Sequence, residues 1–306
     1  MIYKSLKLFL LLLLITESLS AQYIFDNITT KEGLSYKNIR CLLHDQDGYY
    51  WFGTPNGLNR FDGSSIKVFN KANKNVGGLL NDQINSIAEN GDGKLWLATP
   101  LGVTVFDKWQ LTFTAVSFGN LKKPVEIIKL IRDTQSKIWA FTSNEGIFWY
   151  DTKQNQFIHF REDNPIKNAK LFRFGITEDT LRKGIWLPTQ KGLFFLDCHN
   201  QKLNHSTNNP NQWPILNDDV ISATALDKEG NLWYSDVTDK HLHHYDFRTK
   251  QEKKLGMLVK NPYTEFSDGA NKLFVDSQGM LWISTWRYRA FYLEKNTDEI
   301  KQFDIQ

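Results

Sequence analysis

The sequence is poor in cysteine, in net charge and in long apolar segments. Its 306 residues include two cysteines, Cys41 and Cys198, and 37 basic side chains face 34 acidic ones without a cationic block. Such a chain has no disulfide framework, and we expect two buried thiols instead. The balanced charge excludes the electrostatic footprint of a nucleic-acid-binding protein.

The chain has one long apolar run, and it lies at the N-terminus. The run from Leu8 to Ile15 follows Lys4 and Lys7, and small residues up to Ala21 allow cleavage. This pattern is typical of a secretory signal peptide, because a membrane span needs about 20 apolar residues. We therefore expect residues 1–21 to be removed and the mature chain to be exported to the periplasm, without a membrane span of its own.

Six tryptophans recur at a nearly constant spacing of 43 to 49 residues. A repeat of this length corresponds to about one four-stranded blade of a β-propeller. We predict an all-β propeller of four-stranded antiparallel blades over residues 22–306, with each tryptophan buried on the second strand of its blade. The six are Trp51, Trp96, Trp139, Trp186, Trp233 and Trp282.

The second repeat shows the expected strands most clearly. Short apolar segments alternate with turns rich in glycine and proline, and no helical period is present. The predicted strands are 84–89, 94–99, 103–107 and 111–116.

The residue two places after each tryptophan is small in most repeats. Gly53 is one example, and we expect it to give clearance to the neighbouring blade. Phe141 breaks this rule, and Pro188 lacks the backbone N–H that an inner strand needs. Both blades are therefore predicted to be locally irregular.

Turns of the form Asp-x-x-Gly precede several of the tryptophans, as at Asp227 to Gly230 and Asp276 to Gly279. Aspartate bonds to its own backbone in such a turn, and glycine accepts a positive φ. The turn Asp45-Gln46-Asp47-Gly48 can also be interpreted as a calcium loop, but it has too few oxygen ligands. We predict a plain turn, with no metal and no cofactor.

The phrase Asp-x-x-Gly-x-x-Trp-x-x-Thr-x-x-Gly-Leu, clearest up to Leu58, resembles the two-component regulator propeller repeat. The segment from Phe25 to Ser35 resembles the one that opens the first propeller of such sensors. The likeness covers essentially the whole mature chain and weakens in repeats five and six. It implies a periplasmic ligand sensor in which propellers precede a membrane helix and a cytoplasmic histidine kinase, often in a hybrid system.

The resemblance also implies a seven-bladed ring in which an N-terminal strand completes the last blade. That strand would be about Tyr23 to Ile28, but the sixth repeat has its own outer candidate at Glu299 to Ile305. The chain is thus expected to be an N-terminal sensor fragment with an incomplete seven-bladed ring. A closed six-bladed ring is the alternative.

The histidines His241, His243 and His244 are the most suggestive cluster for catalysis. No cysteine or carboxylate spacing around them matches a zinc site, and we expect a solvated outer strand. The sequence contains no Gly-x-Ser-x-Gly motif and no phosphate-binding glycine loop. We therefore predict no catalytic residues and no enzyme activity for this chain, since the kinase of the full-length family is absent.

Two loops depart from the repeat template, and by topology both lie at the same open end, or mouth, of the propeller. Trp286, Arg287, Tyr288 and Arg289 replace a short Gly-Leu turn in repeat six, and Trp213 lies in a long connection into repeat five. Aromatic rings and arginines suit stacking on sugars and pairing with carboxylates. These five residues are the predicted ligand-binding residues; the alternative is that the tryptophans only cover blade edges.

We interpret the chain as a sensor propeller that recognises an oligosaccharide without turnover. One alternative is a propeller enzyme, such as a lyase with His241 or His205 as base, and another is a protein-interaction scaffold. A homodimer through the sensor region is an assembly that the resemblance leaves open.

Overall fold

The computed structural model describes residues 27–72, 78–119, 121, 123–160, 165–256, 269–286, 289–295 and 297–303. The predicted signal peptide lies outside these ranges, as does most of the predicted N-terminal strand. Residues 27 and 28 are described and do not form a strand.

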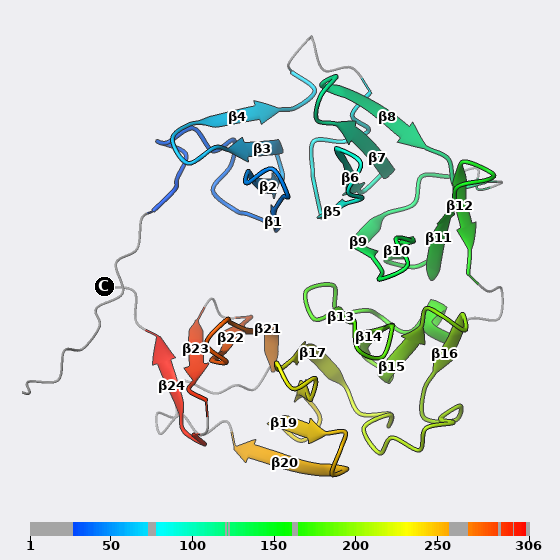
Figure 1. Cartoon of the computed structure of the whole chain (residues 1–306), viewed down its shortest axis with the longest axis vertical. Coiled ribbons are helices and arrows are strands. Elements are labelled where there is room, and N and C mark those ends of the chain that lie inside the picture. Colours follow the sequence, from blue (N-terminus) through cyan, green and yellow to red (C-terminus); the bar gives the residue numbers. More distant parts are fainter. Residues whose placement is uncertain are drawn as a thin grey trace, which may run out of the picture.

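The described chain forms six antiparallel sheets of four strands, which are the six blades of a β-propeller. Within each blade the strands pair in sequence order, with the first strand at the centre and the fourth at the rim (Figure 1). Blade 1 contains β1 (Cys41–His44), β2 (Tyr50–Thr54), β3 (Gly57–Phe61) and β4 (Ile66–Phe69). Blade 2 contains β5 (Ser86–Glu89), β6 (Lys94–Thr99), β7 (Gly102–Asp107) and β8 (Thr112–Val116). Blade 3 contains β9 (Ile127–Arg132), β10 (Ile138–Thr142), β11 (Ile147–Asp151) and β12 (Gln156–His159).

A short 3-10 helix, η1 (Pro165–Asn168), precedes blade 4. Blade 4 contains β13 (Thr177–Asp179), β14 (Gly184–Thr189), β15 (Gly192–Asp197) and β16 (Lys202–Asn204). Blade 5 contains β17 (Ile221–Leu226), β18 (Leu232–Asp236), β19 (His241–Asp246) and β20 (Gln251–Gly256). Blade 6 contains β21 (Ala270–Val275), β22 (Leu281–Thr285), β23 (Ala290–Leu293) and β24 (Ile300–Phe303). The strands predicted for the second repeat are confirmed to within two residues.

Each repeated tryptophan lies on the second strand of its blade, as predicted. The first four are buried, whereas Trp233 and Trp282 are partly buried. Four of the indoles also donate a hydrogen bond to an aspartate that opens the preceding turn. The Nε1 to Oδ2 distances are 2.7 Å for Trp51 and Asp45, 2.7 Å for Trp139 and Asp133, 2.9 Å for Trp186 and Asp179, and 2.9 Å for Trp282 and Asp276.

In these four turns the two carboxylate oxygens of the aspartate bind different groups. Oδ1 of Asp45 accepts the N–H groups of Asp47 and Tyr49, while Oδ2 accepts the indole of Trp51. Gly48 follows with a φ of 88°. The turn chemistry is confirmed, and the second oxygen ties the turn to the core of the blade.

The small residue after the tryptophan is confirmed as a point of close approach in blade 1. A Cβ atom on Gly53 would lie 2.3 Å from Sγ of Cys41 in the same blade and 2.9 Å from the side chain of Ile84, which leads into the next blade. The irregularity predicted for blade 4 is present, because its inner strand β13 is only three residues long. The register between β9 and β10 also shifts at Phe141, but equivalent shifts occur in blades 5 and 6, where the residue is serine, so this shift is not particular to Phe141.

Hydrophobic clusters join successive blades. Five clusters link blades 1 and 2, 2 and 3, 3 and 4, 4 and 5, and 5 and 6. Among the described residues no such cluster joins blade 6 to blade 1, and these two blades stand further apart than other neighbours (Figure 1). Leu42 on β1 and Phe274 on β21 are 59% and 55% exposed. The propeller thus has six blades and one seam that apolar packing does not close.

The two cysteines are free. Cys198 is buried and Cys41 is partly buried. Burial raises the pKa of the Cys41 thiol to about 12, so this thiol stays protonated at neutral pH.

Candidate functional site

The segment between blades 3 and 4 shapes one mouth of the propeller. This mouth carries the turns between the second and third strands of each blade, and we call it the mouth face. Leu171 forms a β-bridge with Thr189, and the N–H of Phe172 donates to the carbonyl oxygen of Pro188 at 3.0 Å. The N–H of Gly175 then donates to the carbonyl of Phe172, which closes a tight turn. The turn carries Phe172, Arg173 and Phe174.

Pro188 accounts for this turn. Proline accepts a ladder hydrogen bond but cannot donate one, so a continuous inner strand opposite Pro188 would leave a carbonyl unpaired. The chain turns away at Phe172 and resumes as β13 at Thr177. A local defect in strand pairing thereby places two aromatic rings and a guanidinium at the mouth.

Gly175 fixes the turn against blade 5. Its carbonyl oxygen accepts the backbone N–H of Thr224 at 3.2 Å and the Thr224 hydroxyl at 2.6 Å. A Cβ atom at this position would lie 2.5 Å from the carbonyl oxygen of Ser222 and 2.6 Å from Cα of Ala223. Both of these are backbone atoms and cannot rotate away, so only glycine fits.

We expect Gly175→Ala to lower the free energy of unfolding by about 1–3 kcal/mol, because the methyl group overpacks the contact with blade 5. Urea denaturation followed by intrinsic fluorescence measures this loss. A loss below about 0.5 kcal/mol, which is typical of neutral surface substitutions, would show that the turn is not held as described.

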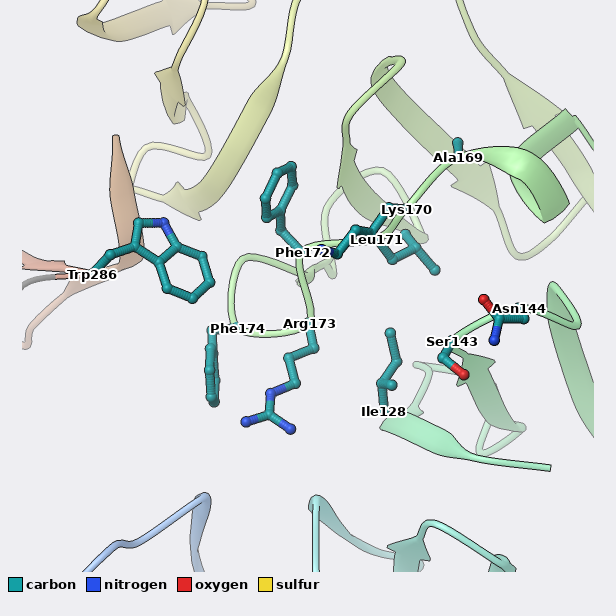
Figure 2. Close-up of a pocket in the computed structure, with 10 residues that line it drawn as sticks. All are labelled: Ile128, Ser143, Asn144, Ala169, Lys170, Leu171, Phe172, Arg173, Phe174 and Trp286. Carbon is teal, nitrogen blue, oxygen red and sulfur yellow. The ribbon is translucent and has the colours of Figure 1, made fainter. Parts of the chain in front are cut away.

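The turn borders a pocket of about 700 Å³ at the mouth face. In the view of Figure 2, the indole of Trp286 and the ring of Phe172 lie to the left, Phe174 and Arg173 project downward from the turn, and Ser143 and Asn144 lie to the right. Blade 3 contributes the far wall. The lining residues are Ile128, Ser143, Asn144, Ala169, Lys170, Leu171, Phe172, Arg173, Phe174 and Trp286.

Arg173 lines this pocket and is electrostatically coupled to Arg40, and a second coupled pair of cations, Lys129 and Lys272, lies on the inner strands β9 and β21. The guanidinium of Arg173 lies 4.2 Å from the ring centroid of Phe174, and burial together with Arg40 lowers the pKa of Arg173. Burial and then Lys272 lower the pKa of Lys129 to about 8. Among the described residues no ion pair with a carboxylate joins any of these four cations. Unpaired, mutually repelling cations favour an anionic ligand.

The structure brings one of the predicted binding residues into the pocket. Trp286 lies in the turn between β22 and β23, as predicted, and is 42% exposed. The N–H of Thr285 donates to the carbonyl of Arg289 at 3.1 Å, which closes the same turn. Arg287 and Tyr288 lie outside the described residues.

Trp213 lies elsewhere. Its indole packs between blades 4 and 5, at centroid distances of 5.4 Å from Trp186, 5.2 Å from Phe195 and 5.4 Å from Phe247. Asn209 fixes its backbone with two hydrogen bonds. Trp213 is not among the pocket residues. Its observed contacts are those of a side chain that covers a blade edge.

The expectation of a solvated histidine strand is wrong. The three histidines lie on β19, the third strand of blade 5, because β20 takes the outer place and carries the exposed side chains. His243 is buried, His244 bonds to Asp227 at 2.8 Å, and only His241 is substantially exposed. His205 lies in the connection after β16, where burial lowers its pKa.

The turn at Asp45 has a cation of its own. The ammonium of Lys108 lies 3.0 Å from Asp45, 2.6 Å from Asp47 and 2.7 Å from Glu89. Its side chain is 6% exposed. The three carboxylates converge, and the lysine occupies the position that a calcium ion would take.

Sequence reasoning did not find the residues from 170 to 174. They lie in an irregular connection with no repeat period. The available signal was Pro188. It predicted a break in blade 4, but it did not predict the turn of Phe172, Arg173 and Phe174 that lies there. The inner-strand cations were also missed, because they lie on different blades and no spacing in the sequence connects them.

Two segments, residues 33–56 and 78–100, match the family model described as "Two component regulator propeller". The chain contains two-component regulator propeller repeats. Among characterised proteins, histidine kinase P4 of Formosa agariphila is 32% identical over 65 residues. The match covers 21% of this chain and 5% of the kinase.

Solved structures with a similar fold fall into two groups. The extracellular domain of the putative hybrid two component system BT3049 from B. thetaiotaomicron has a TM-score of 0.60 and 18% identity, over 92% of this chain and 42% of that one. The corresponding domain of the putative one component system BT4673 from the same organism has a TM-score of 0.56 and 20% identity, over 85% and 38%. Virginiamycin B lyase from Staphylococcus aureus has a TM-score of 0.62 and 11% identity, over 87% and 83%.

These likenesses show the propeller fold. The repeat-containing chain spans about two fifths of each of the two extracellular domains. Within the described residues, no helix has the length and apolar character that crossing a membrane requires.

Proposed function

We propose that this propeller is the ligand-sensing input module of a two-component signalling protein and acts outside the cytoplasm. The propeller repeats and the similarity to extracellular domains of such systems support this assignment. In this proposal the chemistry of the propeller is ligand binding without turnover. The signal would pass to domains beyond these repeats.

We propose further that the ligand is an oligosaccharide with an acidic group. The observation that carries this proposal is the pocket between Phe172, Phe174 and Trp286, with Arg173 beside it. Aromatic faces stack on the apolar faces of sugar rings, and a guanidinium matches a carboxylate or a sulfate. Lys129 and Lys272, on the inner strands β9 and β21, add further positive charge to the propeller.

We expect Trp286→Ala and Arg173→Gln each to weaken binding of a uronic acid-containing oligosaccharide by about 1–3 kcal/mol, as is typical of an aromatic or arginine anchor. The free energy of unfolding should change by less than about 0.5 kcal/mol for Trp286→Ala, because the indole is exposed. Calorimetric titration with matched acidic and neutral oligosaccharides measures the effect.

Two control variants match these substitutions in residue type. Trp109 is 73% exposed in the turn between β7 and β8, and Arg248 is exposed in the turn between β19 and β20. Both turns connect third and fourth strands, on the side away from the mouth face. Trp109→Ala and Arg248→Ala should leave affinity unchanged. Equal binding of neutral and acidic ligands would contradict the role of Arg173.

A lyase is the competing function, because lyases share this fold. It predicts that the acidic oligosaccharide is cleaved, with appearance of an unsaturated product that absorbs in the ultraviolet. Saturable binding with no product over the same period supports the sensor instead.

A further inference from the structure

The hairpin of β18 and β19 in blade 5 departs from the pattern of the other blades. The second strand ends in threonine in five blades, at Thr54, Thr99, Thr142, Thr189 and Thr285. In the first four of these the threonine hydroxyl bonds to a carbonyl oxygen of the following turn. Blade 5 has Asp236 at this position, buried at 3% exposure. Its Oδ1 accepts the N–H groups of Thr238 and Asp239. A hydroxyl would serve this capping role, so the turn does not explain the carboxylate.

His243 faces the same hairpin from the next strand. It is 2% exposed and stacks on Tyr234 at a centroid distance of 4.6 Å. Its Nε2 lies 3.0 and 3.1 Å from the two carboxylate oxygens of Asp239, and its Nδ1 lies 3.2 Å from Oε1 of Glu252. The Tyr234 hydroxyl donates to the same Glu252 oxygen. Both ring nitrogens therefore point at carboxylates.

Glu252 Oε1 accepts the Tyr234 hydroxyl and can accept a hydrogen bond from Nδ1–H of His243. In a neutral ring with this tautomer, the Nε2 lone pair faces two carboxylate oxygens. That contact is repulsive unless Nε2 carries a proton or binds a metal ion. A histidine whose other nitrogen donates to a carboxylate is the usual support of a metal-ligating histidine.

We propose that Asp236, Asp239 and His243 form a binding site for a divalent transition metal ion, with Zn²⁺ as the favoured ion. One ligand atom from each residue lies within 4.8 Å of the others. One imidazole nitrogen and two carboxylate oxygens suit Zn²⁺, which takes N and O ligands in tetrahedral sites and is bound more tightly than most first-row ions. Calcium disfavours a nitrogen ligand. Solvent supplies the fourth position, since Asp239 is 30% exposed.

Lys254 is the competing cation at this site. Its ammonium lies 2.9 Å from Oδ2 of Asp239, and its side chain is 56% exposed. An exposed lysine can rotate into water when a metal arrives. The contrasting cluster of Asp45, Asp47 and Glu89 holds Lys108, which is 6% exposed and bonds to all three carboxylates. That cluster already has its counterion, whereas the His243 site has one that can leave.

The test is titration of the purified, chelator-treated chain with ZnCl₂ by calorimetry, with Co²⁺ absorption as a second readout. We expect one equivalent of Zn²⁺ to bind, with proton release, and Co²⁺ to show bands of nitrogen and oxygen ligands. Asp236→Thr inserts the residue that the other blades use, so the hairpin should fold. It should weaken Zn²⁺ binding by at least about 100-fold, and His243→Gln should do the same.

His244→Gln is the matched control. His244 is adjacent on β19, points to the opposite face and bonds to a single aspartate, Asp227. This variant should bind Zn²⁺ as the unaltered chain does. Absence of saturable binding up to ~1 mM Zn²⁺ would overturn the proposal and leave Nε2 with a proton only. Affinity unchanged in Asp236→Thr, or Co²⁺ bands typical of thiolate ligands from Cys41 or Cys198, would overturn it as well.

Discussion

Trp139→Ala should lower the free energy of unfolding by about 3–5 kcal/mol, the usual cost of truncating a fully buried tryptophan. The indole is 0% exposed and lies in the cluster that joins blades 3 and 4. Its removal also takes the Nε1 donor from Asp133, whose carboxylate is buried. Cavity formation and an unpaired carboxylate therefore add in one variant. Equilibrium denaturation in urea measures the loss.

Trp282→Ala is the matched control, because it removes the same residue from the equivalent strand. Trp282 also donates to an aspartate, Asp276, but it is only partly buried, and within the described ranges no apolar cluster packs a following blade against it. We expect a loss of about 1–2 kcal/mol, within the ordinary range for single substitutions. Equal losses in the two variants would contradict the view that each indole stabilises mainly by packing on the next blade.

Lys108→Met should lower the free energy of unfolding by about 3–5 kcal/mol at pH 7, because removal of one partner from a buried ion pair leaves charge uncompensated. Asp45 and Glu89 have side-chain exposures of 0% and 10%, so water replaces the ammonium poorly. Lys94→Met is the control. Lys94 and Asp92 form an exposed pair at 3.8 Å, and the expected loss there is below about 1 kcal/mol.

The effect of Lys108→Met on the free energy of unfolding should depend on pH in a definite direction. Burial raises the pKa of Asp45, but hydrogen bonds from Trp51 and Lys108 outweigh it, and the net pKa is below the ordinary value. A depressed pKa contributes stability that is present above the unfolded value, about 3.9, and is lost as the pH falls. Without Lys108 the pKa of Asp45 should rise, because burial is then opposed only by the hydrogen bonds from Trp51 and the backbone. The difference between the two proteins should thus shrink as the pH falls from about 7 toward 4. A difference independent of pH would show that Lys108 acts through packing alone.

The repeat made most of the fold predictable from sequence. A tryptophan every 43 to 49 residues and turns ending in glycine predict the blades and the second-strand position of the indoles, and Pro188 predicts the break in blade 4. Each of these features depends on residues close together in the chain. The bond from the indole of Trp186 to Asp179 did not follow, because it depends on how two strands of one blade are oriented.

The sites were less predictable, because they join residues from different blades or depend on one side-chain direction. Trp286 was found as a departure from the repeat, and its partners Phe172 and Phe174 lie in another blade's connection. Trp213 also departs from the repeat, yet it packs on Trp186. His243 was judged by its spacing to cysteines and carboxylates along the chain. Its relevant carboxylates include Glu252, which reaches it across the β19 and β20 pair.

The seam between blades 6 and 1 changes how this propeller holds together. In a ring joined on all sides every blade has two neighbours, and loosening one requires breaking two apolar interfaces. Here five apolar interfaces connect six blades in the described chain. The stability of the propeller is therefore a sum of blade terms and five neighbour terms, as in a linear repeat protein, although the blades are arranged in a ring. The two terminal blades, β1 to β4 and β21 to β24, each pack against a neighbour through one apolar interface. We expect local unfolding to begin in these blades. Trp286 in the mouth pocket comes from blade 6, whereas the other lining residues come from blade 3 and from the connection between blades 3 and 4. A displacement of blade 6 would therefore change the width of the pocket.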